Sequence, residues 1–487
     1  MVEVKDDKQR IYFGVKPQNY LSIDDAQIAV ISWIYAKYSH AELVFCIEDI
    51  HSQYSSELYI NKLVDNLKWL GIDYKKTVDE QGSELQFRQS ERLSIYQNMA
   101  KQLVTEGKAY RCYCKPKSIR NQTNGENSHY YNLKCNSKCY QLSSEQRDKF
   151  EKGGIRPRVY LKVDVDQFEI DDPVQGKIEF TENDLFDFII LREDGKPTKN
   201  FAVAVDMHAL DISFRFQPNN QRSNSMEQHL IIEALGEPIV KFAHISNIKE
   251  TSYVHLQNHD LRRSIDYYRN EGYLPQALVE WLATFDLPGE FEYVHHTLEQ
   301  LITRFTFDRD ADNLLEIDQQ RLDWINSQCI KESDLETIVD LAKPFLKKVD
   351  IPLNDMKKVR RIVEILSKQA INLAGLAADV KLFFTDEIII LDSQSRAIIR
   401  RDNSQKVFWS FLRELKNIEN LTADVFRKIM QSVQKETGII GKDLWLPIRI
   451  ALTGKDMECE LPMIAELLGK AKCEKFITNI VQNMNIE

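Results

Sequence analysis

The fold is decided by the stretch Ile11–Lys37, which reads IYFGVKPQNYLSIDDAQIAVISWIYAK. It begins with a short apolar run, Ile11–Val15, and after a polar turn it is apolar nearly all round over Ala26–Tyr38. These lengths predict a buried strand followed by a buried helix. The same order returns in Leu43–Ile47 and in the amphipathic segment Tyr59–Leu70. Strands separated by helices of this length predict βαβ units, and therefore a parallel sheet covered on both faces.

Further along the chain the pattern changes twice. Residues 85–109 are expected to form one more helix, but the periodicity then stops between 112 and 154, a polar segment that holds four of the eight cysteines. Alternating apolar and polar residues in 155–192 predict half-buried strands, so the region after 110 is interpreted as an insertion. Beyond about residue 275, apolar residues recur at helical spacing to the end. The predicted fold class is therefore α/β, with an insertion and an all-helical C-terminal half.

The composition is typical of a soluble globular protein. The chain has 487 residues, 43% of them hydrophobic and 28% charged, enough for several domains. Its 64 Lys and Arg against 74 Asp and Glu give a net charge of −10, which argues against a non-specific nucleic-acid coat but allows a local basic face. No stretch reaches the ~18 apolar residues of a membrane span, and the charged start is unlike a secretory signal. We therefore expect a cytoplasmic monomer that makes no membrane contact.

Short motifs follow the opening stretch in a fixed order along the chain. They are IED at Ile47–Asp49, KWLGI at Lys68–Ile72, QSERLSIY at Gln89–Tyr96, EGKAYRCYC at Glu106–Cys114, DGKPTKNFAVAVD at Asp194–Asp206, EGYLPQAL at Glu271–Leu278, RLDWIN at Arg321–Asn326 and LPIRIALTG at Leu446–Gly454. Together they resemble the glutamate–tRNA ligases, a class I aminoacyl-tRNA synthetase family, over nearly the whole chain. The helical C-terminal half separates the chain from the related glutamine–tRNA ligases, whose anticodon domain is built of β-barrels.

The resemblance implies a domain organisation. It assigns a Rossmann-like catalytic-type domain to residues 1–110 and 190–260, and an inserted acceptor-arm domain of the zinc type to 111–189. A helical stem-contact domain would cover 261–330, and a helical anticodon-binding domain 331–487. Fold alone does not establish activity, because activity depends on the residues of the site.

The turn before the first helix departs from the family pattern. The family has a histidine and two glycines there, where backbone N–H groups stabilise the phosphates of ATP, whereas this chain has Ser22, Asp24 and Asp25. Each added carboxylate would repel a triphosphate, by ~1–4 kcal/mol for a charge pair at 4 Å. The same residues suit a stable helix start, with Ser22 as N-cap and both aspartates favourable to the helix dipole. We predict that the helix is kept and ATP chemistry is lost, so ATP and magnesium are expected only if the enzyme is still active.

The second ATP signature of the family, a loop with two lysines, falls on residues 255–259, HLQNH. His255 and Asn258 stand at degenerate catalytic positions, and both lysines that would neutralise the leaving pyrophosphate are missing. A loop rebuilt around His255 and His259 as cations is the alternative, although histidine is neutral at pH 7 unless its pKa is raised.

The glutamate pocket is altered as well. By the resemblance, arginines of the family are replaced by Tyr12 and Gln217, so the bidentate pairing with substrate carboxylates is lost. Lys199 replaces a tyrosine nearby. The residues of this pocket that survive are Glu48, Asn200, Asp206 and Asn224. In the family Glu48 would pair with the amino group of glutamate; ordinary capping or surface chemistry is the alternative reading of all four.

Four cysteines predict a metal site in the insertion. Cys112 and Cys114 are followed by Cys135 and Cys139, four thiols within 28 residues. In a cytosolic protein such a group favours structural zinc over disulfides, and a polar insertion needs such a staple. Some family members carry zinc here, usually with another spacing of the second pair. Four free thiols remain the alternative.

Basic residues in the C-terminal half are candidates for tRNA binding. The set is Lys357, Lys358, Arg360, Arg361 and Arg449. A solvated helix face is the alternative interpretation; the resemblance favours tRNA, because this domain reads the anticodon in the family.

Three functional hypotheses follow. The first is a catalytically impaired paralogue that still binds tRNA or a protein partner. The second is a divergent but active glutamate–tRNA ligase, and the third is a protein that senses or transfers another small acidic metabolite. The loss of several independent catalytic groups beside intact core motifs favours the first.

Overall fold

The computed structural model describes residues 9–18, 20–50, 56–75, 77–78, 84–85, 87–114, 139–236, 240–249, 263–287, 294–309, 315–388, 392–456 and 460–484. The chain divides into two compact units. The first unit comprises Met1–Tyr268 and Leu278–Gln319, and the second comprises Arg269–Ala277 and Gln320–Glu487. The finer division into domains stays a prediction.

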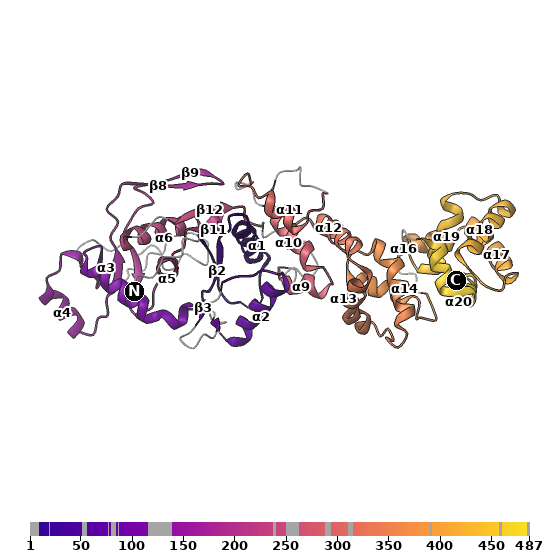
Figure 1. Cartoon of the computed structure of the whole chain (residues 1–487), viewed down its shortest axis with the longest axis horizontal. Helices are drawn as coiled ribbons and strands as arrows, with labels where there is room; N and C mark the ends of the chain where they lie inside the picture. Colours follow the sequence, from indigo (N-terminus) through magenta and orange to yellow (C-terminus); the bar gives the residue numbers. More distant parts are fainter. Residues whose placement is uncertain are drawn as a thin grey trace. The chain divides into compact units, whose positions relative to one another are not determined.

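A five-stranded sheet forms the centre of the first unit, in the order β12-β11-β1-β2-β5 (Figure 1). Its strands are β1 Arg10–Val15, β2 Glu42–Ile47, β5 Phe87–Arg88, β11 Phe214–Pro218 and β12 Lys241–Ile245. Every neighbouring pair is parallel. The register pairs Tyr12 of β1 with Arg215 of β11, two residues that lie far apart in the sequence.

Helices connect these strands, as parallel pairing requires. They are α1 Ile23–Tyr38, α2 Glu57–Trp69, α3 Leu93–Thr105, α5 Lys199–Ala209 and α6 Arg222–Leu235. α1 begins three residues before the predicted helix, because the Ser22 side chain caps its first turn. The helix predicted over 85–109 is wrong at its start, where β5 and a 3-10 turn, Gln89–Arg92, precede α3.

The insertion predicted after residue 110 is present, with its own antiparallel sheet. Its strands are β6 Ala109–Cys112, β7 Arg158–Leu161 and β10 Phe188–Leu191, in the order β10-β7-β6, and α4 spans Ser144–Lys152. A hairpin of β8 Gln167–Asp172 and β9 Gly176–Thr181 follows β7. It is anchored on β12, where Asp172 Oδ2 accepts from the backbone N–H and Nδ1 of His244. A short pair, β3 Thr77–Val78 and β4 Glu84–Leu85, completes the strands.

The C-terminal half is helical, as predicted. Its elements are α9 Ile265–Asn270, α10 Pro275–Thr284, α11 Leu298–Thr303, α12 Gln319–Glu332, α13 Leu335–Lys348, α14 Met356–Leu366, α15 Leu373–Lys381, α16 Ser393–Ile399, α17 Asp402–Lys416, α18 Ala423–Thr437, α19 Lys442–Thr453 and α20 Leu461–Met484. The predicted fold class is confirmed. Across the described part of the chain, none of the helices has both the length and the apolar content that a membrane span requires.

Candidate functional site

The N-terminus of α1 is occupied by the protein's own polar groups. Ser22 Oγ accepts a hydrogen bond from the backbone N–H of Asp25 at 3.1 Å and donates one to Asp25 Oδ2 at 2.7 Å. Asp24 lies in the same turn. Burial raises the pKa of the Asp25 carboxyl, and the Ser22 hydroxyl opposes that rise. Helix N-termini attract external anions, but here an internal hydroxyl and two acidic side chains already take this position.

Three side chains, from β1, β11 and the end of β2, meet on the face of the sheet opposite the one where Tyr35 of α1 packs against Phe214 and Phe216. Tyr12 Oη lies 3.4 Å from Glu48 Oε1 and donates to it, and Arg215 Nη2 lies 3.5 Å from the same oxygen. The guanidinium carbon of Arg215 stands 4.6 Å from the centre of the Tyr12 ring. We call Tyr12, Glu48 and Arg215 the internal triad.

The internal triad is closed to solvent. The Tyr12 side chain is fully buried, and those of Glu48 and Arg215 are only 4% and 6% exposed. Burial, with a contribution from nearby acidic groups, raises the pKa of Tyr12 well above its ordinary value. A β-carbon at Gly14 would collide with both Glu48 Oε1 and the Tyr12 ring, so this packing requires glycine there. Lys199 Nζ approaches the other oxygen of Glu48, at 3.7 Å.

Arg215 is the residue of this site that sequence reasoning missed. It lies two positions before Gln217 on β11, and side chains two apart share one face of a strand. That spacing was the available signal: an arginine two residues before a position where the family has one can present its guanidinium on the same face. Arg215 Nη1 is buried and finds no hydrogen-bond partner among the described residues.

Asn200 and Asn224, two of the surviving residues of the predicted pocket, belong to a chain of hydrogen bonds that begins at Gln217. Gln217 Nε2 donates to Gln228 Oε1, whose amide donates to Asn200 Oδ1 at 3.0 Å. Asn200 Nδ2 in turn donates to Glu227 Oε2 at 2.7 Å and lies 3.2 Å from Asn224 Oδ1. Burial raises the pKa of Glu227 to about 7. The structure therefore joins Gln217, Asn200 and Asn224 in one hydrogen-bonded chain, and their role in binding a substrate stays a prediction.

Asp206 belongs to a different network. Its carboxylate accepts from Gln89 Nε2, Arg92 Nε and Tyr96 Oη at 2.8–3.0 Å. Burial raises its pKa to about 6, although these donors oppose the rise. Because α3, α5 and the turn before α3 meet at this carboxylate, its described contacts hold helices together.

Three of the four predicted metal ligands converge at the insertion. The sulfur atoms of Cys112, Cys114 and Cys139 all lie within 4.8 Å of one another, and the Sγ atoms of Cys114 and Cys139 are 3.4 Å apart. Thiolates arranged in this way suit a tetrahedral zinc ion, which needs a fourth ligand. Cys135, the predicted fourth ligand, lies outside the described residues, as do His255 and Asn258.

The predicted basic cluster of the second unit is largely engaged within the protein. Arg360 pairs with Glu336 at 2.6 Å, Arg361 with Glu364 at 3.0 Å, and Arg449 with Asp456 at 3.1 Å. The Lys358 ammonium lies over the Phe384 ring, while Lys357 precedes it on the first turn of α14. Exposed ion pairs are weak and leave the cations accessible to a phosphate.

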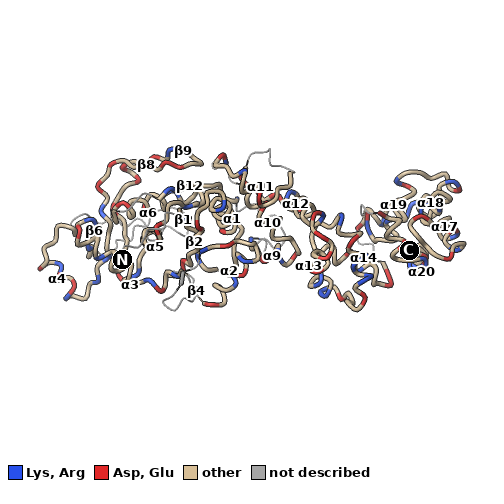
Figure 2. The backbone as a smooth tube through the Cα atoms, in the orientation of Figure 1, with Lys and Arg blue, Asp and Glu red and all other residues tan. Residues whose placement is uncertain are grey.

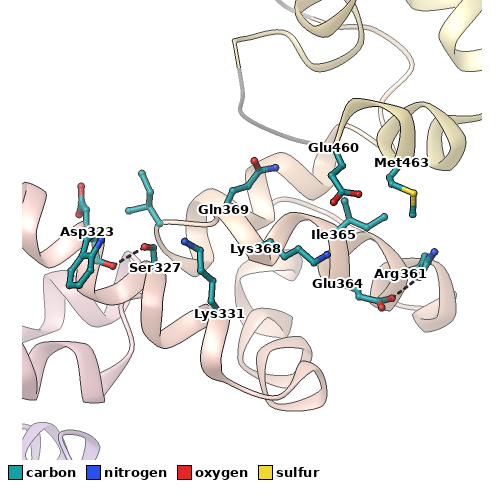
Figure 3. Close-up of a pocket in the computed structure, with 12 residues that line it drawn as sticks. Asp323, Ser327, Lys331, Arg361, Glu364, Ile365, Lys368, Gln369, Glu460 and Met463 are labelled. Carbon is teal, nitrogen blue, oxygen red and sulfur yellow. Dashed lines mark hydrogen bonds and ion pairs between the residues drawn. The ribbon is translucent and has the colours of Figure 1, made fainter. Parts of the chain in front are cut away.

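A hollow of about 690 Å³ lies beside this cluster within the second unit (Figure 3). It is bounded by α12, α14, the residues that follow α14, and the start of α20. Lys331, Lys368 and Arg361 contribute cations, and Asp323, Glu364 and Glu460 contribute carboxylates. Of the predicted tRNA-binding residues, the structure places Arg361 at this hollow.

Comparison with known proteins defines the class. The family of class I tRNA synthetases for E and Q matches at its catalytic domain over residues 10–324, and an anticodon binding domain matches over 337–481. The chain therefore belongs to the class I tRNA synthetase family of the E and Q type.

Two solved structures share the fold of the whole chain. A glutamate–tRNA ligase from Elizabethkingia meningosepticum, solved in complex with its amino acid, has a TM-score of 0.78 and 20% identity, with 98% of this chain and 100% of that chain covered. A glutamate–tRNA synthetase from Elizabethkingia anophelis has the same TM-score and coverage at 19% identity. The resemblance read from the motifs is confirmed: the chain matches the E and Q family and shares the fold of glutamate–tRNA ligases.

Proposed function

We propose that this chain is a catalytically impaired member of its family that retains tRNA binding. The observation that carries the proposal is the internal triad. In the family reading, Tyr12 stands where an arginine would hold the substrate, and Glu48 where a carboxylate would hold its amino group. Here Glu48 is already paired with Arg215 and Tyr12, and all three are closed to solvent.

The residues at the start of α1 do not fit the phosphates of ATP. The family uses ATP and magnesium, but Ser22 and Asp25 satisfy each other at the helix N-terminus and add negative charge. By Coulomb's law, a phosphate placed against the Asp25 carboxylate in a site of low dielectric would be repelled by several kcal/mol.

The second unit supports the tRNA half of the proposal. Residues 331–487 carry 25 Lys and Arg against 23 Asp and Glu, whereas the remainder of the chain carries 39 against 51. Figure 2 shows Lys and Arg positions interspersed with Asp and Glu positions along the helices of this unit. Lys331, Lys368 and Arg361 line one hollow of this unit and are the proposed phosphate contacts.

A structural zinc ion is part of the proposal. Cys112, Cys114 and Cys139 would supply three thiolates and Cys135 the fourth, and zinc would hold the polar insertion together. The proposal also includes a monomeric protein that can bind a protein partner.

One observation favours a second candidate, the binding of a small acidic metabolite. The Nη1 atom of Arg215 is buried and unpaired, and the Oε1 atom of Gln217, two residues along the same strand face, is in the same state among the described residues. A carboxylate that entered here would satisfy the guanidinium. Isothermal titration with glutamate would detect it, and Arg215→Met should abolish it.

The deciding experiment pairs two assays on one preparation. ATP–pyrophosphate exchange, with glutamate and tRNA-Glu present, should be at background, while a tRNA titration at two salt concentrations should give salt-sensitive binding. Robust exchange would refute the impairment. Absence of both activities would refute tRNA binding as well and direct attention to a protein partner.

A further inference from the structure

The outer face of α17 carries an aromatic ring between cations. The exposed side chains of this helix are Asn403 and a row of five: Asp402, Lys406, Trp409, Arg413 and Lys416. The spacing of four and three residues places these five in one stripe along the helix. Trp409 is 59% exposed, a large fraction for a side chain that normally buries most of its surface. Neither the predicted basic cluster nor the hollow of Figure 3 includes this stripe.

A second hollow of the second unit lies beside Trp409. It measures about 910 Å³, and its other lining residues are Asp402, Gln405, Lys406, Ser410, Arg413, Glu436 and Thr437. Trp409 is the one large apolar side chain among these lining residues. A hollow that receives an apolar protein segment would be lined by several such side chains, so this surface is better suited to a flat polar ligand with an exposed ring face.

The charges along the stripe are arranged to favour an anion. Glu436 is neutralised within the protein, because Arg413 pairs with it and Ser410 Oγ donates to it at 2.5 Å. Lys406 and Lys416 have no ion pair with any described residue. At 1.5 Å rise per residue, they lie ~15 Å apart along the helix, with the Trp409 ring between them.

We propose that Trp409 is a stacking platform for an unpaired RNA base, and that Lys406 and Lys416 contact the phosphates on either side. This deepens the proposed tRNA binding and rests on it, since α17 lies inside the region that matches an anticodon binding domain. Duplex bases are stacked on each other and cannot offer a free face, whereas a loop can. Stacking of a base on an aromatic side chain is largely independent of sequence, so the platform adds affinity rather than specificity.

The test uses fluorescence anisotropy with three probes: a tRNA-Glu transcript, its isolated anticodon stem–loop, and a blunt RNA duplex of equal length. Trp409→Ala should weaken binding of the tRNA and the stem–loop ~5- to 150-fold, the factor that corresponds to ~1–3 kcal/mol per stacked base. Trp409→Phe should recover most of the affinity, and the duplex should respond to neither change. Lys406→Ala should reduce the slope of log affinity against log salt concentration by about one. Lys428 is an exposed lysine of α18 outside the hollow, and Lys428→Ala should leave that slope unchanged.

The outcomes separate this inference from the proposed function. If the wild-type protein binds tRNA and Trp409→Ala binds it within about twofold, the platform is refuted and tRNA binding stands. If Trp409→Ala weakens the duplex as much as the stem–loop, base stacking is refuted, since a duplex offers no free base. If the wild-type protein binds none of the three probes, both proposals fail. Circular dichroism of each variant, with Trp409→Phe as the conservative substitution, excludes misfolding as the cause.

Discussion

Replacement of Arg215 by methionine tests the internal triad directly. Arg215→Met removes the guanidinium and keeps an apolar stem of similar length. The Glu48 carboxylate would then stay 4% exposed, with Tyr12 Oη at 3.4 Å and Lys199 Nζ at 3.7 Å as its remaining neighbours. Breaking a buried ion pair by removing one partner costs ~3–5 kcal/mol, because the other charge is left uncompensated.

Two further contributions change the expected loss of stability in Arg215→Met, and they act in opposite directions. Loss of the contact between the guanidinium and the Tyr12 ring adds up to ~2 kcal/mol. Lys199 offsets part of the loss, but its side chain is 41% exposed and solvent screens it. We therefore expect Arg215→Met to lower the stability of the first unit by ~3–5 kcal/mol. The double variant Glu48→Gln/Arg215→Met should recover most of that loss, since no charge is then stranded.

The assay must report on the first unit alone, because a chain of two units does not unfold as one two-state system. Hydrogen exchange of peptides that cover β1, β2 and β11, followed across a urea series, meets this need. Arg111→Met is the matched control in the same unit: its pair with Glu151 is exposed, and its loss should cost ~0–1 kcal/mol. A loss below ~1 kcal/mol for Arg215→Met, or no recovery in the double variant, would show that Glu48 is not held as a buried paired charge.

Three further predictions concern the other described sites. Ser22→Ala removes both hydrogen bonds to Asp25 and should destabilise the first unit by ~0.5–2 kcal/mol in the same exchange assay; an unchanged α1 would contradict the capping role. Cys114→Ser should reduce zinc to well below one ion per chain by metal analysis, whereas Cys473→Ser, a buried thiol of α20, should not; wild-type protein without zinc would end the metal proposal. Glu227→Gln should flatten the pH dependence of stability: burial raises the pKa of Glu227 to about 7, so the folded state holds a proton that the unfolded state releases, and the wild-type first unit should lose stability as pH rises from about 4.5 to 7. Equal pH profiles for both proteins would exclude Glu227 as the titrating group.

The sequence indicated the fold because the relevant signals are local. A short continuous apolar run such as Ile11–Val15, bounded by polar residues, is typical of a strand buried on both faces, and repeated strand–helix units favour a parallel sheet. The helical spacing of apolar residues after residue 275 likewise predicted the helices of the C-terminal half. The error over 85–109 arose where a two-residue strand and a 3-10 turn precede α3, since so short a strand has no periodicity of its own.

The resemblance to the family also predicted which catalytic groups are missing, because a residue type at a motif position is read without any structure. It did not show what replaced them. Tyr12 and Arg215 are more than two hundred residues apart, and only the parallel pairing of β1 with β11 places the guanidinium over the tyrosine ring and against Glu48. Likewise, the exposure of Trp409 depends on which face of α17 the other helices cover. The periodicity of a helix shows which residues share a face. Whether that face is buried depends on contacts with residues distant in the sequence, and these contacts form only when the chain folds.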